Sequence, residues 1–106
     1  MKKIKVNGIS AKIHEDFGRI EFSEGERDLL NRKVNFLRIY DVGYKSKIYD
    51  EFDKCFKQDD KVTIEFSINC ITCICEMRMI QFNLTSAGAE FYMGCCEDDV
   101  QIIEKL

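Results

Sequence analysis

The chain has 106 residues, of which 45% are hydrophobic and 33% charged, and its formal net charge is −3. This composition excludes an intrinsically disordered chain, and the length fits one domain spanning residues 1–106. The acidic excess disfavours polyanionic partners such as nucleic acid or anionic lipid. The sequence contains no apolar run typical of a membrane span or a secretion signal, so we expect a soluble cytoplasmic protein.

The first element expected is a β-hairpin over residues 2–13. Apolar and polar residues alternate in residues 2–6 and again in residues 9–13. Asn7-Gly8 lies between the two runs, and this dipeptide is a strong signal for a type I′ turn. We therefore predict two short antiparallel strands joined at Asn7-Gly8.

The segment after the hairpin has two interpretations. Residues 17–23 continue the alternation of a strand. Ser23 and Glu26 then have the spacing of a helix capping box, which allows a second short helix over about 24–32. Gly25 weakens that interpretation because glycine disfavours helices, and a Glu-Gly turn is the alternative.

A strand followed by an amphipathic helix is predicted next. Residues 33–42 are rich in β-branched and aromatic residues, with apolar side chains on both faces, which is typical of a covered central strand. The helix is expected over about 46–58, where Ser46 can act as its N-cap. Its apolar residues repeat at one helical face and are expected to point into the core. These residues are Ile48, Phe52, Cys55 and Phe56.

Extended segments dominate the rest of the chain, with a break near Asn69 and a hairpin loop at 85–89. They cover residues 61–68, 70–84, 91–95 and 100–106, the last as a short strand or helix. Short connections between neighbouring strands imply antiparallel pairing. The predicted fold class is α+β, a mainly antiparallel sheet covered by one helix, arranged as a meander or a small curled barrel.

The cysteines offer one possible chemistry, since six of them occur in this short chain. Four converging thiolates could hold zinc, and the C-x-x-C and C-x-C spacings make a metal or thiol-redox site the alternative function. β-Branched neighbours favour strands over a zinc knuckle, so we expect reduced, structural thiols and no cofactor. The candidates for the alternative are Cys70, Cys73, Cys75, Cys95 and Cys96.

Signals for catalysis are weak. His14 is the only histidine, and it lies beside two acidic residues in an expected turn. The sequence has no phosphate-binding loop, no EF-hand loop and no nucleophile elbow. We therefore expect a protein that is not an enzyme.

Basic residues gather loosely in the middle of the chain, near Tyr40 and Tyr44, and this stretch is the only one that could suit nucleic acid. Interleaved acidic residues favour a solvated surface instead. The basic residues are Arg27, Arg32, Lys33, Arg38, Lys45 and Lys47.

The function predicted by elimination is a non-catalytic protein-binding module. A sheet covered by one helix leaves strand edges whose backbone groups can pair with a partner, and a groove beside the helix is a second surface. The terminal segments 2–6 and 100–106 are the expected edges. Lysines in the first segment disfavour non-specific pairing with other strands. Partner binding or homo-oligomerisation is therefore assigned to Val100, Ile102 and Ile103.

Overall fold

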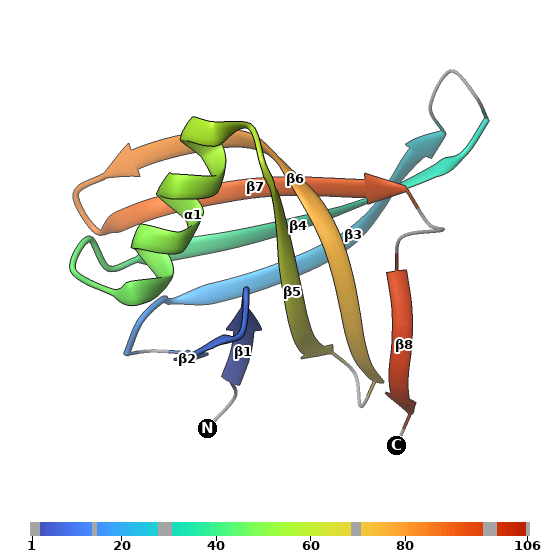
Figure 1. Cartoon of the computed structure of the whole chain (residues 1–106), viewed down its shortest axis with the longest axis horizontal. Coiled ribbons are helices and arrows are strands. Elements are labelled where there is room, and N and C mark those ends of the chain that lie inside the picture. Colours follow the sequence, from blue (N-terminus) through green and yellow to red (C-terminus); the bar gives the residue numbers. More distant parts are fainter. Residues whose placement is uncertain (1–2, 14, 28–30, 69–70, 97–99, 106) are drawn as a thin grey trace.

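A computed structural model describes residues 3–13, 15–27, 31–68, 71–96 and 100–105 of the chain. These residues form eight strands and one helix, an α+β arrangement with antiparallel strand pairing, as the sequence predicted (Figure 1). In chain order the elements are β1 (Lys3–Val6), β2 (Ile9–Lys12), β3 (Arg19–Arg27), β4 (Lys33–Val42), α1 (Lys47–Gln58), β5 (Lys61–Ile68), β6 (Ile71–Thr85), β7 (Gly88–Cys96) and β8 (Val100–Lys105).

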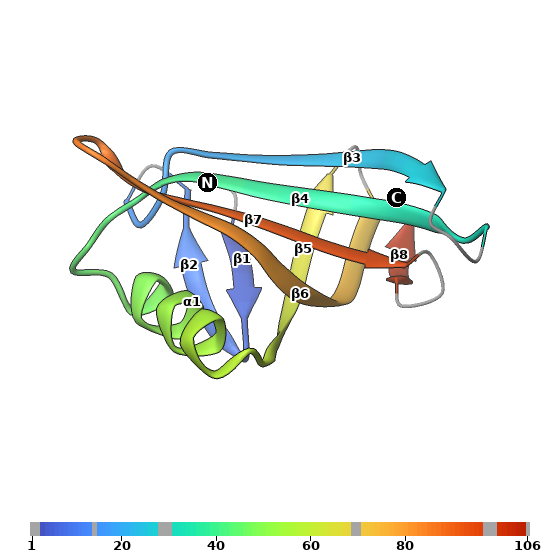
Figure 2. The same cartoon turned by 90° about the horizontal axis from the view of Figure 1, so that it is seen from above.

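The strands form one sheet that folds over on itself. Its order is β2-β1-β5-β6-β7-β4-β3, and β8 pairs with β6 beside this path. Figure 2 shows β3, β4 and β7 running across β1, β2, β5 and β8, with α1 at one end of the space between these two layers. Among the described residues the end strands β2 and β3 each pair with one strand only, so the sheet stays open and the barrel alternative is wrong.

β6 belongs to both layers because it changes partners along its 15 residues. Its first half pairs with β5 from Ile68↔Ile71 to Lys61↔Arg78. Its second half pairs with β7 from Arg78 onwards, with a register shift between Met79 and Gln81. Such a bulge bends a strand and increases its twist, which carries β6 from one layer into the other.

The N-terminal hairpin is confirmed. Val6 pairs with Ile9, so the loop has two residues, and both have positive φ (49° for Asn7 and 84° for Gly8). Positive φ at both positions is the requirement of a type I′ turn. The Asn7 side chain also accepts a hydrogen bond from the backbone N–H of Thr63 (2.9 Å), which ties the turn to β5.

The helix is confirmed with its cap. The Ser46 hydroxyl accepts a hydrogen bond from the Tyr49 N–H (3.1 Å), which satisfies one of the unpaired donors at the helix start. Ile48, Phe52 and Cys55 are buried, as predicted. Phe56 was expected in the core, but its side chain is 40% exposed and meets the Phe82 ring at the rim (5.7 Å between centroids).

The second short helix, proposed for about 24–32, is wrong for the residues that the structure describes. Residues 24–27 belong to β3, where Glu24 pairs with Asn35 and Arg27 with Lys33 of β4. Residues 28–30 lie outside the described part of the chain. Pairing with β4 supplies backbone partners that an isolated turn of helix containing Gly25 lacks.

β4 is a central strand, but only its inner face is covered. Leu37 and Ile39 are buried, whereas Phe36, Arg38 and Tyr40 are half-buried on the outer face. A register shift between Ile39 and Val42 breaks the alternation, and Asp41 within it has a φ of 56°. This irregularity turns Val42 inward, although simple alternation placed Val42 on the same face as Tyr40.

The core lies between the two layers and forms one cluster of buried side chains. β4 and β7 contribute one side of it, β5 and β6 the other, and Phe52 of α1 contacts Phe91 at one end (4.6 Å between centroids). The described part of the chain has one helix, and that helix is too short and too polar to cross a lipid bilayer.

Phe52 should be the helix residue on which stability depends most. Its side chain is fully buried, so Phe52→Ala should lower the free energy of unfolding by about 3–5 kcal/mol through lost contacts and a cavity. Lys54→Ala on the exposed side of the same helix should change it by less than about 0.5 kcal/mol. Urea melts of the two variants measure the difference, and equal losses would contradict the assigned helix face.

Candidate functional site

The predicted partner edge at the C-terminus forms a strand. β8 pairs with the first half of β6, with Val100 opposite Cys75 and Ile102 opposite Cys73. In the described residues β8 has β6 as its single strand partner, so its other side is an edge. The side chains of Val100, Ile102 and Ile103 lie outside the described part of the structure.

β3 is a second and longer edge that the sequence analysis did not propose. It has nine residues and pairs with β4 alone among the described strands. Ile20 and Phe22 point inward from it and are only half-buried, and the Phe22 ring meets Phe66 of β5 (5.4 Å between centroids). The edge therefore offers backbone groups next to partly exposed apolar side chains.

Aromatic contacts pack the helix against the sheet on the side where the sequence predicted an alternative groove. Tyr49 and Phe52 of α1 both meet Phe91 of β7, at 6.0 and 4.6 Å between ring centroids. Tyr44, just before the helix, donates its hydroxyl hydrogen bond to the Thr85 carbonyl at the end of β6. These contacts anchor α1 on the β6–β7 hairpin.

The cysteines lie mostly in the core. Cys75 and Cys95 are buried, Cys73 and Cys96 are half-buried, and Cys70 lies outside the described residues. Cys75 and Cys95 come from neighbouring strands and share a hydrogen bond between their thiols. Among the described residues, no group of three or more His, Cys, Asp or Glu side chains is arranged to hold a metal ion.

The buried thiols have perturbed acidity. The hydrogen bond with Cys95, together with burial, raises the pKa of the Cys75 thiol far above its ordinary value. Burial alone raises the pKa of Cys73. Since the thiolate is the nucleophile, both groups are poor nucleophiles at neutral pH.

The other residues considered for chemistry are not brought together. His14 lies outside the described residues. Arg32 and Lys33 lie at the start of β4, whereas Lys45 and Lys47 follow its far end, at the start of α1 (Figure 1). A ten-residue strand is roughly 30 Å long, so these basic residues form no single patch.

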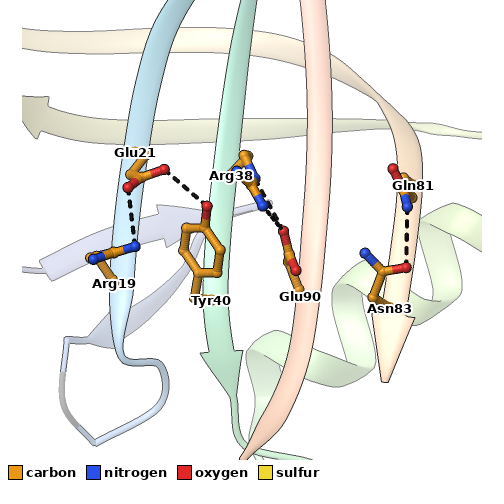
Figure 3. Close-up of polar contacts among 7 residues, drawn as sticks. All are labelled: Arg19, Glu21, Arg38, Tyr40, Gln81, Asn83 and Glu90. Carbon is orange, nitrogen blue, oxygen red and sulfur yellow. Dashed lines mark hydrogen bonds and ion pairs between the residues drawn. The ribbon is translucent and has the colours of Figure 1, made fainter. Parts of the chain in front are cut away.

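The outer face of β3, β4, β7 and β6 carries an ordered polar array. Register places Glu21, Arg38, Tyr92 and Gln81 opposite one another in one row across these four strands. Beside this row Arg19 opposes Tyr40, and Asn83 opposes Glu90. Figure 3 shows these side chains on the outer face; Tyr92 belongs to the same face but is not drawn there. We call this surface the outer polar face.

Ion pairs and hydrogen bonds hold the outer polar face in place. Arg38 donates to one carboxylate oxygen of Glu90 through Nε (3.0 Å) and also through Nη2. Tyr40 donates to Glu21 (2.9 Å), which also pairs with Arg19 (3.2 Å). The Tyr40 ring lies between the Arg19 and Arg38 guanidinium groups, at 4.9 and 4.6 Å.

The electrostatic consequences follow from these contacts. The hydrogen bond with Glu90 raises the pKa of Arg38, which keeps its charge permanent. Burial and the hydrogen bond to Glu21 raise the pKa of Tyr40, so its hydroxyl stays protonated. The face therefore presents compensated charges and a protonated Tyr40 at ordinary pH.

A hollow of about 800 Å³ opens beside the β3 edge of this face, and residues of all four strands line it, together with Ser67 of β5. Ile20 and Phe22, which point inward from β3, belong to its lining as well. Its lining includes Glu21, Arg38, Gln81, Asn83, Glu90 and Tyr92. This volume lies within the range of about 300–1,000 Å³ that is usual for ligand sites. Of the residues on this face, only Arg38 and Tyr40 stood out in the sequence.

Phe36 forms the apolar end of the outer polar face. Its ring stacks on Tyr92 with 5.3 Å between centroids and an interplanar angle of 11°. A Cβ placed on Gly25 would lie 2.0 Å from the Phe36 ring, and one on Gly94 would lie 3.3 Å from it. The ring has room over the sheet because its register partner on β7 is Gly94, and because Gly25 lies two residues beyond its register partner Ser23 on β3.

Comparison with known proteins assigns no relative. No protein-family model matches the chain, and neither a curated protein nor a solved structure matches it.

Gly25 and Phe36 should be energetically coupled. Gly25→Ala should cost roughly 1 kcal/mol, because the ring must leave its stack on Tyr92, and such stacks contribute about 0.5–1.5 kcal/mol. In a Phe36→Ala background the same change should cost little, since the clash is gone. A double-mutant cycle from urea melts measures the coupling, and additive effects would contradict it.

Ionisation of the Cys75 thiol should lower the free energy of unfolding at alkaline pH. The pKa of the Cys75 thiol is higher in the folded than in the unfolded protein, so folding favours the protonated thiol. The stability that this thiol contributes is therefore complete below the pKa of the unfolded thiol, and it is lost as the pH rises above that value. Above about pH 9 the free energy of unfolding should fall by up to about 1.4 kcal/mol per pH unit from this thiol. Urea melts between pH 7 and 10 should therefore show a shallower decline for Cys75→Ala than for the wild type.

The matched control is Val62→Ala, which truncates another buried residue without removing an ionisable group. Its decline with pH should be parallel to that of the wild type. If Cys75→Ala is also parallel to the wild type, the raised pKa is wrong.

Proposed function

We propose that the protein is a non-catalytic module that binds an extended segment of a protein partner along a strand edge. The observation that carries this proposal is the open sheet, in which β3 and β8 each have one strand partner among the described residues. Unpaired N–H and C=O groups along such an edge can extend the sheet with a strand from another chain. A second copy of the same chain could use the same edges.

Different observations favour β8 and β3 as the edge that binds the partner. β8 contains Val100, Ile102 and Ile103, the residues assigned to partner binding from the sequence. β3 is longer, and its half-buried Ile20 and Phe22 would gain cover from apolar side chains of an added strand. An alternating apolar and polar segment is the partner that fits such an edge, because successive side chains of a strand point to opposite faces.

The proposal places the protein in the cytoplasm. A reducing compartment suits the five described cysteines, which are thiols and largely buried. Raised pKa values at Cys73 and Cys75 support a structural use of these thiols and a non-catalytic protein.

Site-specific photo-crosslinking in the native host tests the edges. A crosslinking amino acid is placed at Ser23 in β3, at Gln101 in β8, and at Lys54 on the exposed side of α1 as the control. We expect a discrete protein adduct, or a homodimer, from Ser23 or Gln101 and none from Lys54. Adducts from Lys54 alone, or from none of the three positions, would contradict the proposal.

Hydrogen exchange on the purified complex then tests strand addition itself. Pairing should slow the exchange of alternate amides in the edge that crosslinks, because every second residue of an edge strand points its N–H outward. Unchanged exchange along both β3 and β8 in a stable complex would rule out strand addition.

A further inference from the structure

The hollow on the outer polar face is a second surface, and it shares residues 20–23 of β3 with one of the proposed strand edges. Its floor is built from the row Glu21, Arg38, Tyr92 and Gln81, which runs across four strands. Asn83 and Glu90 form the adjacent pair. Strand register determines that these residues lie next to one another on the same face of the sheet.

The polar groups of this hollow include both donors and acceptors. Arg38 supplies only donors and Glu90 only acceptors, whereas Gln81 and Asn83 supply both. Gln81 donates to Asn83 across 3.2 Å, so the two amides already form a connected pair on β6. A ligand that matches this set must itself donate and accept at closely spaced positions, as neighbouring hydroxyl groups do.

The charges argue against a polyanion. Arg38 is paired with Glu90 and Arg19 with Glu21, so each guanidinium on this face has a carboxylate partner. A phosphate or sulfate group entering the hollow would meet two carboxylates as well as the two cations. The compensated charges favour a neutral ligand.

The hollow also has an apolar side. Tyr92 lines it, and its ring stacks on Phe36, while the Arg38 guanidinium carbon lies 5.9 Å from the centroid of the Tyr92 ring. Aromatic faces attract the slightly positive C–H bonds of a sugar ring, while a tyrosine hydroxyl can still form a hydrogen bond. A sugar ring combines an apolar face with a rim of hydroxyl groups, which are the two properties that this surface pairs.

We propose that the hollow binds a neutral carbohydrate, with a sugar ring against Tyr92 and its hydroxyl groups bound by Arg38, Glu90, Gln81 and Asn83. The side-chain amides supply hydrogen bonds to paired hydroxyls, and the Arg38–Glu90 pair supplies a charged donor and acceptor next to them. The size of the hollow, about 800 Å³, gives room for more than a single small polar group.

Titration of the full chain with maltohexaose, cellohexaose and chitohexaose tests this assignment. We expect saturation transfer to at least one of these probes and chemical-shift changes at the side-chain NH₂ signals of Gln81 and Asn83. The absence of binding to all three probes would overturn the proposal. Binding of heparin or single-stranded oligothymidine at these same signals, with no neutral probe bound, would also overturn it in favour of a polyanion site.

Two variants place the binding in the hollow. Asn83→Ala should weaken the best probe roughly tenfold, because a lost hydrogen bond of about 1–1.5 kcal/mol corresponds to that factor. Tyr92→Ala should abolish measurable binding, with retained folding checked by the backbone spectrum. Thr63→Ala, on the outer face of β5, is the control and should bind like the wild type. Unchanged affinity in both hollow variants would overturn the assignment.

Discussion

The change of partners along β6 is the constraint on which the rest of the sheet depends. If β6 paired with the same neighbours over its whole length, β5 and β7 would lie in one flat layer, and neither face could be buried by a single helix. The bulge between Met79 and Gln81 turns the strand, and the two halves then face each other across the core. Met77 and Met79, which come just before the bend, are buried in the space that this turn creates.

Local signals in the sequence were sufficient for the elements that depend on their own residues. Asn7-Gly8 determines its turn through backbone conformation, and Ser46 caps α1 through a contact three residues away. β5 also depends on its own residues, because Val62 and Ile64 follow the regular alternation of a strand and are buried. Fold class and helix position could therefore be predicted from the sequence.

Bulges were the main feature that the sequence could not reveal. An irregularity changes which face the following residues occupy, so Val42 is buried two residues after half-buried Tyr40, at a shift marked by Asp41. On β6, Phe82 turns toward the core while Ile80 remains 50% exposed. No residue type demands a bulge at either place, since both arise from fitting one strand against two neighbours.

The outer polar face was hidden because its members lie far apart in the chain. Arg38 was grouped with basic residues near it in sequence, whereas its actual partner is Glu90, on a strand that follows the helix and two further strands. That pairing replaces an apparent cationic stretch with a neutral surface. Gly25 likewise looked like a turn or a poor helix residue, although its role is to leave room for the Phe36 ring.

β4 and β7 are neighbours in the sheet but lie far apart in the sequence, and this has a consequence for synthesis on the ribosome. The β3–β4 hairpin leaves the exit tunnel before any residue of β7 has been made, so Leu37 and Ile39 lack their cover at that stage. β1 also lacks one of its partner strands at that stage, because β5 is synthesised after the helix. Exposed apolar strands are prone to wrong pairing, and the nascent chain therefore passes through a period in which chaperones could bind it.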